Sequence, residues 1–370
     1  MPAPILRRAS AASAALVSAV AIAGAPGTVV VPQPHTSSIV FTRIQYDTDA
    51  IAINSALLLA DGGGAVRTLT PTVEGVHDTG ASWSPRGTRV VFERRDTKAR
   101  NRDTLFVAER TGKVRRLVPG TGPYRTPAWG PQDKIAFVSV RGEQQCLSVV
   151  DADGHHRRDL FCPASPAEIM RPVWSVDGSR LFVATGYYSG RIDIVWHAQA
   201  WQVDAATGAA RKLAEGEMEE ARTLTFSPDG TRGIYSDSYP TEMTLVDFRN
   251  GNVSTLGVGC FPRWSPDGSR IAYTGEVYES APDFRYYEPL FVMDADGSDA
   301  RRVTTARVDN HIYAPVDWSR DGVHVLANRI VFTDPSVTQR TTSLRIVDVD
   351  SGEVKRMPAG YAEPGAWFEP

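Results

Sequence analysis

Apolar and polar residues alternate in short stretches along most of the chain. The pattern is clear in "RIAYTG" from Arg270 and in "PLFVMDA" from Pro289. Alternation over about four to eight residues is typical of β-strands with one buried face. The pattern therefore predicts an all-β protein built from many short strands.

Short strings rich in Ser, Pro, Asp and Gly separate these strands. In Ser265-Pro266-Asp267-Gly268, Ser suits the first position of a type I turn, and Pro fixes φ at the second. Asp suits the third position, and Gly accepts the left-handed fourth and starts the next strand as a hairpin bulge. "DADG" from Asp294 repeats this logic without proline. We therefore interpret the turn string as architecture rather than as a catalytic motif.

The turn string recurs behind an aromatic residue at intervals of 38 to 54 residues. Its copies are "WSPRG" at Trp83, "WGPQD" at Trp129, "WSVDG" at Trp174, "FSPDG" at Phe226, "WSPDG" at Trp264, "WSRDG" at Trp318 and a truncated "AWFEP" around Trp367. Each repeat holds a strand ending at the aromatic residue, a turn, two apolar strands, a second turn and a fourth strand. Four-stranded units at this spacing are the signature of β-propeller blades. We expect the aromatic residue to pack between neighbouring sheets.

The repeats predict a seven-bladed β-propeller of four-stranded blades. The blades are expected at 38–71, 77–119, 124–163, 169–215, 220–257, 260–306 and 311–359. The first blade lacks one strand, and residues 363–370 supply a strand at the other end of the chain. We therefore expect the ring to close by pairing of the C-terminal strand with the first blade, which removes exposed sheet edges. A degenerate first blade would change this count by one.

The stretch "PRWSPDGSRIAYTG…EPLFVMDADGSDARRVTT" from Pro262 resembles the TolB-like, WD-repeat-like β-propeller family. The resemblance extends over nearly the whole chain after the N-terminal segment, and it implies a fold rather than a function. The chain departs from TolB itself, which carries an α/β domain before a six-bladed propeller. Similar repeats also precede the hydrolase domain of prolyl-oligopeptidase-type peptidases, and we expect no such domain here. The partners of TolB are therefore not carried over.

The first 23 residues have the organisation of a secretory signal peptide. Arg7 and Arg8 precede an uncharged run rich in Ala and Val, and "AIA" at 21–23 suits cleavage before Gly24. An uncleaved anchor is the alternative, although the run is short for a membrane span. We expect a signal peptide at 1–23, a flexible lead-in at 24–37 and a single β-propeller domain at 38–370. The mature chain is expected to be secreted or to reside in the cell envelope.

The charge balance excludes some classes of partner. The chain has 370 residues, of which 22% are charged and 42% hydrophobic, and its formal net charge is −3. It therefore carries no basic footprint for nucleic acid or an anionic membrane. No later segment reaches the roughly 18 apolar residues of a transmembrane helix. We expect a monomer without a transmembrane segment in the mature chain.

The strand order gathers the long connections at one end of the sheets and the tight turns at the other. Binding usually resides on long, individual loops, and Tyr and Arg are frequent at interface hot spots. The candidate ligand- or partner-binding residues are Tyr187, Tyr188, Arg191, Tyr278, Tyr286 and Tyr287 in these loops, with Arg125, Arg171, Glu220, His77 and His311 near the channel mouth. The alternative is that the tyrosines pack the loops and the arginines are solvated. We interpret "RRDTKARNRD" from Arg94 as a solvated loop.

Signals of catalysis are sparse. The chain has no G-x-S-x-G elbow, no H-E-x-x-H motif and no phosphate-binding loop, and its "DADG" strings lack the later ligands of an EF-hand. His77 and His311, together with Asp47, Asp78 or Glu363, form one conceivable metal or proton-transfer site. A hydrogen-bonded channel lining is the alternative, and we expect no catalytic residue, no metal and no cofactor.

The three cysteines bear on the redox state. Cys146 and Cys162 fall in the last two strands of the third predicted blade, nearly opposite each other. They form a disulfide if the strand register allows it, since export permits oxidation. The alternative is that both remain thiols. Cys260 is expected to be a free, buried thiol.

Two functions remain open. The first is an exported TolB-like β-propeller that binds an unknown protein or glycan of the cell envelope or exterior, without catalysis, through the long-loop face and channel mouth. The second is a carbohydrate lyase or hydrolase with its active site at the channel mouth. A scaffold within a larger assembly is a third possibility. The sequence identifies neither the ligand nor the pathway.

Overall fold

The computed structural model describes residues 37–46, 52–61, 65–98, 102–120, 122–165, 167–189, 195–218, 223–236, 240–275, 287–305, 311–332, 340–360, 362 and 367–369. All of them belong to one compact unit, His35–Pro370. Every regular element in these ranges is a β-strand, so the predicted all-β class is confirmed for this part of the chain. The same ranges contain no helix that is long and apolar enough to cross a membrane. The predicted signal peptide and residues 24–36 of the lead-in lie outside the described residues.

The first sheet combines strands from both ends of the chain. It holds β1 (Ser38–Tyr46), β2 (Ala52–Asp61), β3 (Val66–Thr68), β4 (Val76–Trp83), β5 (Arg89–Asp96), β6 (Arg102–Glu109), β7 (Val114–Arg116) and β29 (Trp367–Phe368). The order is β29-β1-β2-β4-β5-β6-β7, with β3 also paired to β2. β29 pairs antiparallel with β1, with Ser38 opposite Phe368. The strand predicted at the end of the chain thus pairs with the first described strand.

The next two sheets each follow one sequence repeat. One holds β8 (Tyr124–Trp129), β9 (Lys134–Arg141), β10 (Gln144–Asp151) and β11 (Arg158–Phe161) in simple order. The other holds β12 (Glu168–Ile169), β13 (Val173–Trp174), β14 (Arg180–Ser189), β15 (Val195–Asp204) and β16 (Ala210–Met218). In that sheet β12 and β13 both pair with β14. Both sheets place the strand that carries the Trp at the start of the repeat.

The last two sheets show where the repeats are continuous. One holds β17 (Thr223–Phe226), β18 (Arg232–Ser236), β19 (Thr241–Asp247), β20 (Val253–Trp264), β21 (Arg270–Thr274), β23 (Leu290–Asp294) and β24 (Arg301–Arg302). β20 pairs with β19 through its first half and with β21 through its second, so one strand joins two repeats. The other holds β22 (Tyr287–Glu288), β25 (His311–Trp318), β26 (His324–Phe332), β27 (Arg340–Asp348) and β28 (Val354–Ala359), with β22 parallel to β25.

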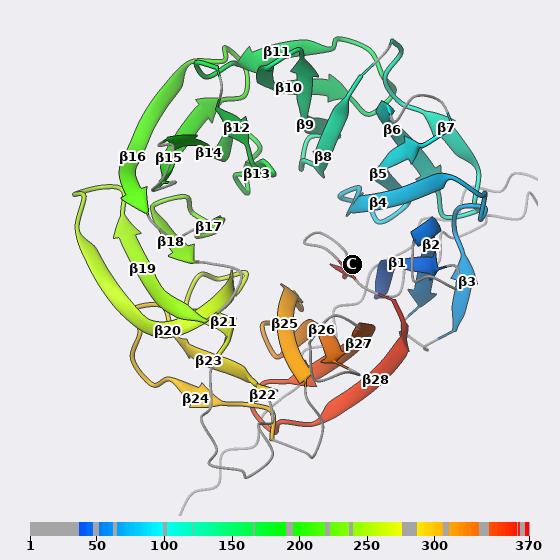
Figure 1. Cartoon of the computed structure of the whole chain (residues 1–370). Helices are drawn as coiled ribbons and strands as arrows, with labels where there is room; N and C mark the ends of the chain where they lie inside the picture. Colours follow the sequence, from blue (N-terminus) through cyan, green and yellow to red (C-terminus); the bar gives the residue numbers. More distant parts are fainter. Residues whose placement is uncertain are drawn as a thin grey trace, which may run out of the picture. The chain divides into compact units, whose positions relative to one another are not determined.

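Within each repeat, successive strands lie progressively farther from the middle of the unit. In Figure 1, β4, β8, β17 and β25 lie nearest the middle, while β7, β11, β16 and β28 lie at the outside. Buried side chains between neighbouring sheets form six apolar clusters. The first cluster unites both ends of the chain, since Phe41 and Leu57 pack in it together with Leu326, Leu344 and Phe368.

The recurring turn string forms tight turns as expected. The amide of Gly268 donates to the carbonyl of Ser265 over 2.9 Å, and Gly268 has φ of +72°. The Ser265 hydroxyl donates to Asp267 over 2.6 Å, and the amide of Ser269 donates to the same carboxylate. These bonds hold the pKa of Asp267 down at about 2, the Ser265 hydroxyl being the largest cause. The turn thus uses its own polar groups internally, which agrees with an architectural role.

The tryptophans pack between neighbouring repeats. The indole nitrogen of Trp318 donates to the carbonyl of Arg263 in β20 over 3.0 Å, and that of Trp174 donates to Ala128 in β8 over 3.0 Å. The sequence did not predict the stacking partner. Arg270, two residues after a turn glycine, lies over the Trp318 ring, 5.2 Å from its centroid. Cation–π contacts of this kind stabilise by about 0.5–1 kcal/mol when partly exposed.

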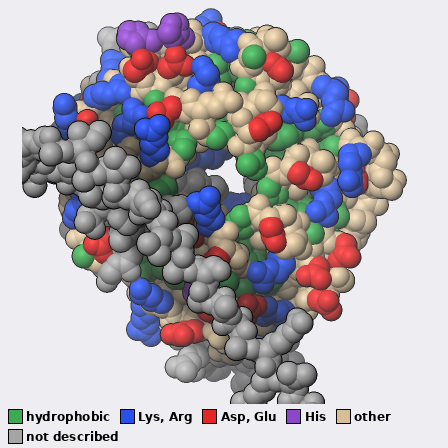
Figure 2. All heavy atoms as spheres, turned by 180° about the vertical axis from the view of Figure 1, so that it is seen from behind, with side chains coloured by type: hydrophobic (Ala, Val, Ile, Leu, Met, Phe, Trp, Pro, Cys, Tyr) green, Lys and Arg blue, Asp and Glu red, His purple; other side chains and the backbone are tan. Residues whose placement is uncertain are grey.

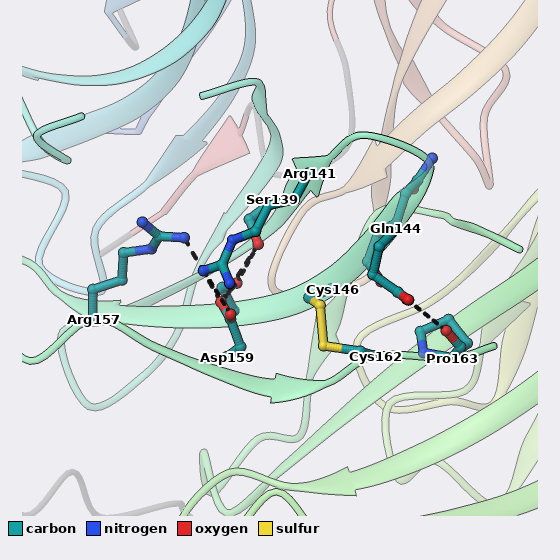
Figure 3. The surroundings of a disulfide bond; sticks show 10 residues. Ser139, Arg141, Gln144, Cys146, Arg157, Asp159, Cys162 and Pro163 are labelled. Atoms are coloured by element: carbon teal, nitrogen blue, oxygen red, sulfur yellow. Dashed lines mark hydrogen bonds and ion pairs between the residues drawn. A yellow bond between two sulfur atoms is a disulfide. The ribbon is translucent and has the colours of Figure 1, made fainter. Parts of the chain in front are cut away.

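The disulfide that the sequence left open is present between Cys146 and Cys162. Cys146 lies in β10, and Cys162 follows directly after β11, so the bond ties two neighbouring strands together (Figure 3). Gln144 donates to the carbonyl of Pro163 over 2.6 Å beside it. Cys260 is a free and buried thiol, as expected.

Candidate functional site

Polar side chains gather where β4, β5, β6 and β8 meet, at the end remote from the tight turns. The register places His77 of β4 opposite Arg95 of β5, and Arg95 opposite Asp103 of β6. Glu93 lies two residues before Arg95 and therefore shares its face, because successive strand residues point to opposite sides. β8 packs against all three strands and brings Arg125 to this face.

Asp103 is the centre of this group. Its side chain is fully buried, whereas Arg95 and Arg125 are 47% and 46% exposed. Arg95 donates from Nε to Oδ1 over 2.6 Å and from Nη2 to Oδ2 over 3.3 Å. Arg125 donates from Nε to Oδ2 over 2.6 Å. One buried carboxylate thus holds two half-exposed guanidinium groups side by side. We name Glu93, Arg95, Asp103 and Arg125 the Arg95–Arg125 cluster.

Glu93 sits beneath the arginines in the Arg95–Arg125 cluster. Burial, followed by the nearby charge of Asp103, raises the pKa of Glu93 from 4.5 to about 7. The amide of Thr126 donates to its Oε2 over 3.2 Å and opposes that rise together with the two arginines. Thr126 has φ of +49° at an irregular point of β8, which turns its amide toward Glu93. The same left-handed backbone recurs three residues before the repeat tryptophan at Gly80, with φ of +66°, and at Phe261, with φ of +51°, so it belongs to a bulge of the inner strand.

Replacing Glu93 by glutamine is expected to raise the free energy of unfolding by about 2 kcal/mol at about pH 8, with little change at about pH 5. The folded protein keeps the proton of Glu93 up to about pH 7, whereas the unfolded chain releases it near the ordinary pKa of 4.5. The folded state therefore binds more protons in this window, and the wild type loses stability as the pH rises through it. Glutamine carries no charge and still accepts the Thr126 amide.

Urea unfolding of both proteins at the two pH values measures this effect. If the free energies of unfolding of the variant and the wild type differ by the same amount at both pH values, Glu93 does not titrate in the folded protein near neutral pH.

Asp78 lies on the opposite face of β4. Its carboxylate receives Nε and Nη2 of Arg94, each over 2.7 Å, and its side chain is fully buried. Consecutive residues of a strand point to opposite sides, so Asp78 does not join His77. The proton-transfer or metal site suggested for His77 with Asp78 is therefore not formed. No group of three or more metal-ligating side chains occurs among the residues that the structure describes.

The basic stretch from Arg94 is not a solvated loop at its start. β5 continues to Asp96, and both Arg94 and Arg95 are paired with buried aspartates. The interpretation was wrong for these two residues because the strand extends further than the apolar alternation indicates. The later members Arg100 and Arg102 lie where the structure describes no side chain.

Arg171 bridges the inner strands. Its Nη2 donates to the carbonyls of Ala81 in β4 over 3.2 Å and of Pro127 in β8 over 2.9 Å. It therefore links β4 to β8, the strand that carries Arg125. Its predicted contact with a ligand stays a prediction.

Two predicted binding residues lie in the interior. Tyr287 belongs to β22 rather than to a loop, and its hydroxyl donates to the carbonyl of Thr304 over 2.9 Å. His311 is 2% exposed and packs edge-on between Tyr287 and Tyr313, with ring centroids 4.8 and 5.2 Å away. The rings of Tyr287 and His311 are buried, so a partner could not contact them in this arrangement. We therefore do not carry their contact roles further.

Of the remaining predicted residues, the structure describes only some. Tyr187 and Tyr188 lie in β14, opposite His197 and Trp196 of β15, so the expected loop is an extended hairpin there. Aromatic and β-branched residues favour strands, which explains the extension. Six further predicted residues lie outside the described residues: Asp47, Arg191, Glu220, Tyr278, Tyr286 and Glu363. Their roles stay predictions.

The tight-turn end carries two cavities. One of about 460 Å³ is lined by Trp83, Trp129, Trp318 and Trp367 among others. One of about 500 Å³ lies among three turns and includes Asp177, Asp229 and Asp267. Figure 2, seen from behind the view of Figure 1, shows an opening with hydrophobic side chains at its edge. The three aspartates accept hydrogen bonds from serines of their own turns, so their carboxylates are already partnered there.

Comparison with known proteins gives the fold but no family. No family model matches the chain. A stretch of 127 residues is 27% identical to the uncharacterized peptidase YuxL of Bacillus subtilis, and 52 residues are 50% identical to the Tol-Pal system protein TolB of Thioalkalivibrio sulfidiphilus. These matches include 31% and 13% of this chain, and only 18% and 12% of the two relatives.

Solved structures resemble the chain over most of its length. An oligogalacturonate lyase from Vibrio parahaemolyticus aligns with a TM-score of 0.60 at 14% identity, over 87% of this chain and 85% of the lyase. The β-propeller domain of the Trilobed protease from Pyrococcus furiosus aligns with a TM-score of 0.59 at 15% identity, over 87% of this chain and 94% of that domain. At such identities the likeness shows a propeller-like fold alone.

Proposed function

We propose that the protein is an exported β-propeller that binds a protein or glycan of the cell envelope or exterior, without catalysis, at the end of the sheets where the long connections lie. The Arg95–Arg125 cluster forms the centre of the binding site. The relatives are named as a peptidase, a lyase and a Tol-Pal system protein, and they do not choose among these activities. The proposal therefore depends on the site.

The proposed propeller has seven blades and closes on itself. The strands support this count. They fall into seven groups of four when β20 is divided between its two neighbours, β29 is counted with β1, β12 and β13 are counted as one strand, and β22, which pairs parallel with β25, is left out. The pairing of β29 with β1 and the shared apolar cluster of Phe41, Leu326 and Phe368 support closure. The domain boundaries of the sequence prediction, 1–23, 24–37 and 38–370, belong to this proposal, and N-terminal sequencing of the exported protein checks the first.

One observation carries the binding proposal: a fully buried aspartate anchors two half-exposed arginines at the same end of adjacent sheets. Guanidinium groups fixed by a buried partner lose little freedom when a ligand binds, and Arg is frequent at binding hot spots. A fully buried carboxylate that pairs with arginines contributes little net stability, because the charges lose their hydration. Orienting the two arginines for a ligand gives this buried charge a function.

Replacing Arg125 by glutamine is expected to weaken partner binding at least tenfold, as expected for a lost charge-assisted bond of about 1.5–3 kcal/mol. The fold is expected to survive, because Arg95 keeps both of its bonds to Asp103. Partners are retained on the immobilised wild type from an envelope and medium extract, and affinities are then measured by surface plasmon resonance. Arg356→Gln, on the exposed outer strand β28, is the matched control. Equal affinities of the two variants would refute the site.

Acid–base catalysis is the second candidate, and the pKa of about 7 at Glu93 is the observation that favours it. A general acid or base works best when its pKa lies near the operating pH. In this version the arginines hold an acidic group of a saccharide, and Glu93 transfers a proton. Glu93→Gln is then expected to abolish turnover of acidic oligosaccharides while binding persists. Absence of turnover by the wild type on a broad panel would remove this candidate.

A further inference from the structure

The two arginines of the Arg95–Arg125 cluster keep donors for a ligand. Asp103 takes two N–H groups of Arg95 and one of Arg125, out of five on each guanidinium group. Among the described residues, no other acceptor bonds to these two side chains, and nearly half of each is exposed. Planar guanidinium donors match the two oxygens of a carboxylate, which accepts them in pairs.

Glu93 decides the charge that such a ligand meets. Around its carboxyl lie Asp103 from β6, Arg95 from its own strand, and Arg125 with the Thr126 amide from β8. His77 of β4 shares the face, opposite Arg95, and Arg171 donates to the carbonyl of Ala81 further along β4. With Glu93 protonated, Asp103 and the two arginines leave one net positive charge; with Glu93 ionised, the cluster is neutral.

We propose that the Arg95–Arg125 cluster is a proton-coupled anion site: it binds the carboxylate of an acidic ligand on the outer edges of Arg95 and Arg125 when Glu93 is protonated, and it releases that ligand when Glu93 ionises. This inference rests on the proposed function, since the carboxylate belongs to its ligand. Negative charge on the ligand and on Glu93 repel each other, so the bound anion favours the protonated form. By linkage, binding near neutral pH takes up a proton.

The sign of the pH dependence follows from this coupling. Ligand carboxylates are ionised above about pH 5, so their own charge stays constant there. Because Glu93 titrates near pH 7, affinity is highest on the acid side and falls as the pH rises through neutrality. A coupling of one pKa unit corresponds to an affinity loss of about tenfold between about pH 5.5 and 8.5.

Isothermal titration calorimetry of the full chain tests the inference. The probes are galacturonate with galactose as its neutral counterpart, and an acetylated dipeptide with its C-terminal amide as the neutral counterpart. The two pairs of probes distinguish a sugar acid from a peptide as the source of the bound carboxylate. We expect an acidic probe to bind, its neutral counterpart to fail, and proton uptake at about pH 7 to appear in buffers of different ionisation enthalpy.

Two variants identify the titrating group. Glu93→Gln is expected to bind at the acid-side affinity at every pH and to take up no proton, whereas His77→Gln is expected to keep the pH dependence and the proton uptake of the wild type. Pairs of acidic and neutral probes that bind equally would overturn the inference. So would a pH dependence that persists in Glu93→Gln, or one that disappears in His77→Gln. Failure of every acidic probe to bind also overturns it, while the partner affinity of Arg125→Gln judges the proposed function separately.

Discussion

Replacing Arg94 by methionine is expected to lower the free energy of unfolding by about 3 to 4 kcal/mol. The substitution leaves the carboxylate of Asp78 fully buried without the two 2.7 Å bonds that Arg94 supplies. It also removes the guanidinium from its position 4.7 Å above the centre of the Phe106 ring. A buried charge without its partner is one of the few causes of such large losses. Chemical denaturation measures the difference.

A double variant separates the charge from the packing. Asp78→Asn combined with Arg94→Met removes the buried charge together with its partner, so it is expected to recover a large part of the loss. Asp96→Asn, in the same strand, is the control for a nonspecific effect of changing β5. If the double variant is no more stable than Arg94→Met alone, the stability of this part does not depend on the ion pair.

Replacing Phe368 by alanine is expected to lower the free energy of unfolding by about 3 kcal/mol. The side chain is 9% exposed and belongs to the apolar cluster that joins both ends of the chain. Its ring lies 5.8 Å from the ring of Trp83, and it fills the space beside Gly87, where even a Cβ atom would lie 2.3 Å from it. Its loss therefore leaves a cavity at the junction of β29 with β1.

Val258→Ala is the matched control, because Val258 is 53% exposed on β20 and its truncation leaves no cavity. Thermal unfolding of the two variants compares them directly. A Phe368→Ala protein as stable as the Val258→Ala protein would show that the last strand does not secure the first, and it would remove the main support for a closed ring.

The repeats explain how much of the fold the sequence could predict. Turn strings such as Ser265 to Gly268 act locally, because the hydrogen bonds that close each turn join residues at most five positions apart. Turn position and the packing of the tryptophans could therefore be predicted from spacing alone. The pairing of β29 with β1 could be predicted as well, because the first repeat lacks a strand and the chain ends with one.

The binding site could be predicted only in part. Arg125 was identified, but Glu93, Arg95 and Asp103 were not, because their meeting depends on the register of three strands and on a neighbouring repeat. The useful signal was available: charged residues at the end of an otherwise apolar strand, as in "VVFERRD" from Val90, indicate a paired rather than a solvated end. Tyr287 and His311 were selected for residue type, which does not indicate burial.

The two ends of the sheets differ in chemistry. The tight-turn end holds the cavity lined by Trp83, Trp129 and Trp318, and Asp267 accepts a hydrogen bond within its own turn. The opposite end offers arginines with donors to spare and a carboxyl that titrates near neutral pH. This contrast favours the Arg95–Arg125 cluster as the place where a ligand is selected by its charge.

The most direct test of this account is a crystal structure of the protein with the partner that the wild type retains. The account predicts that the partner contacts the outer edges of Arg95 and Arg125, with both still bonded to Asp103. A partner bound only at the tight-turn end, around Trp83 and Trp318, with the Arg95–Arg125 cluster open to solvent, would contradict it.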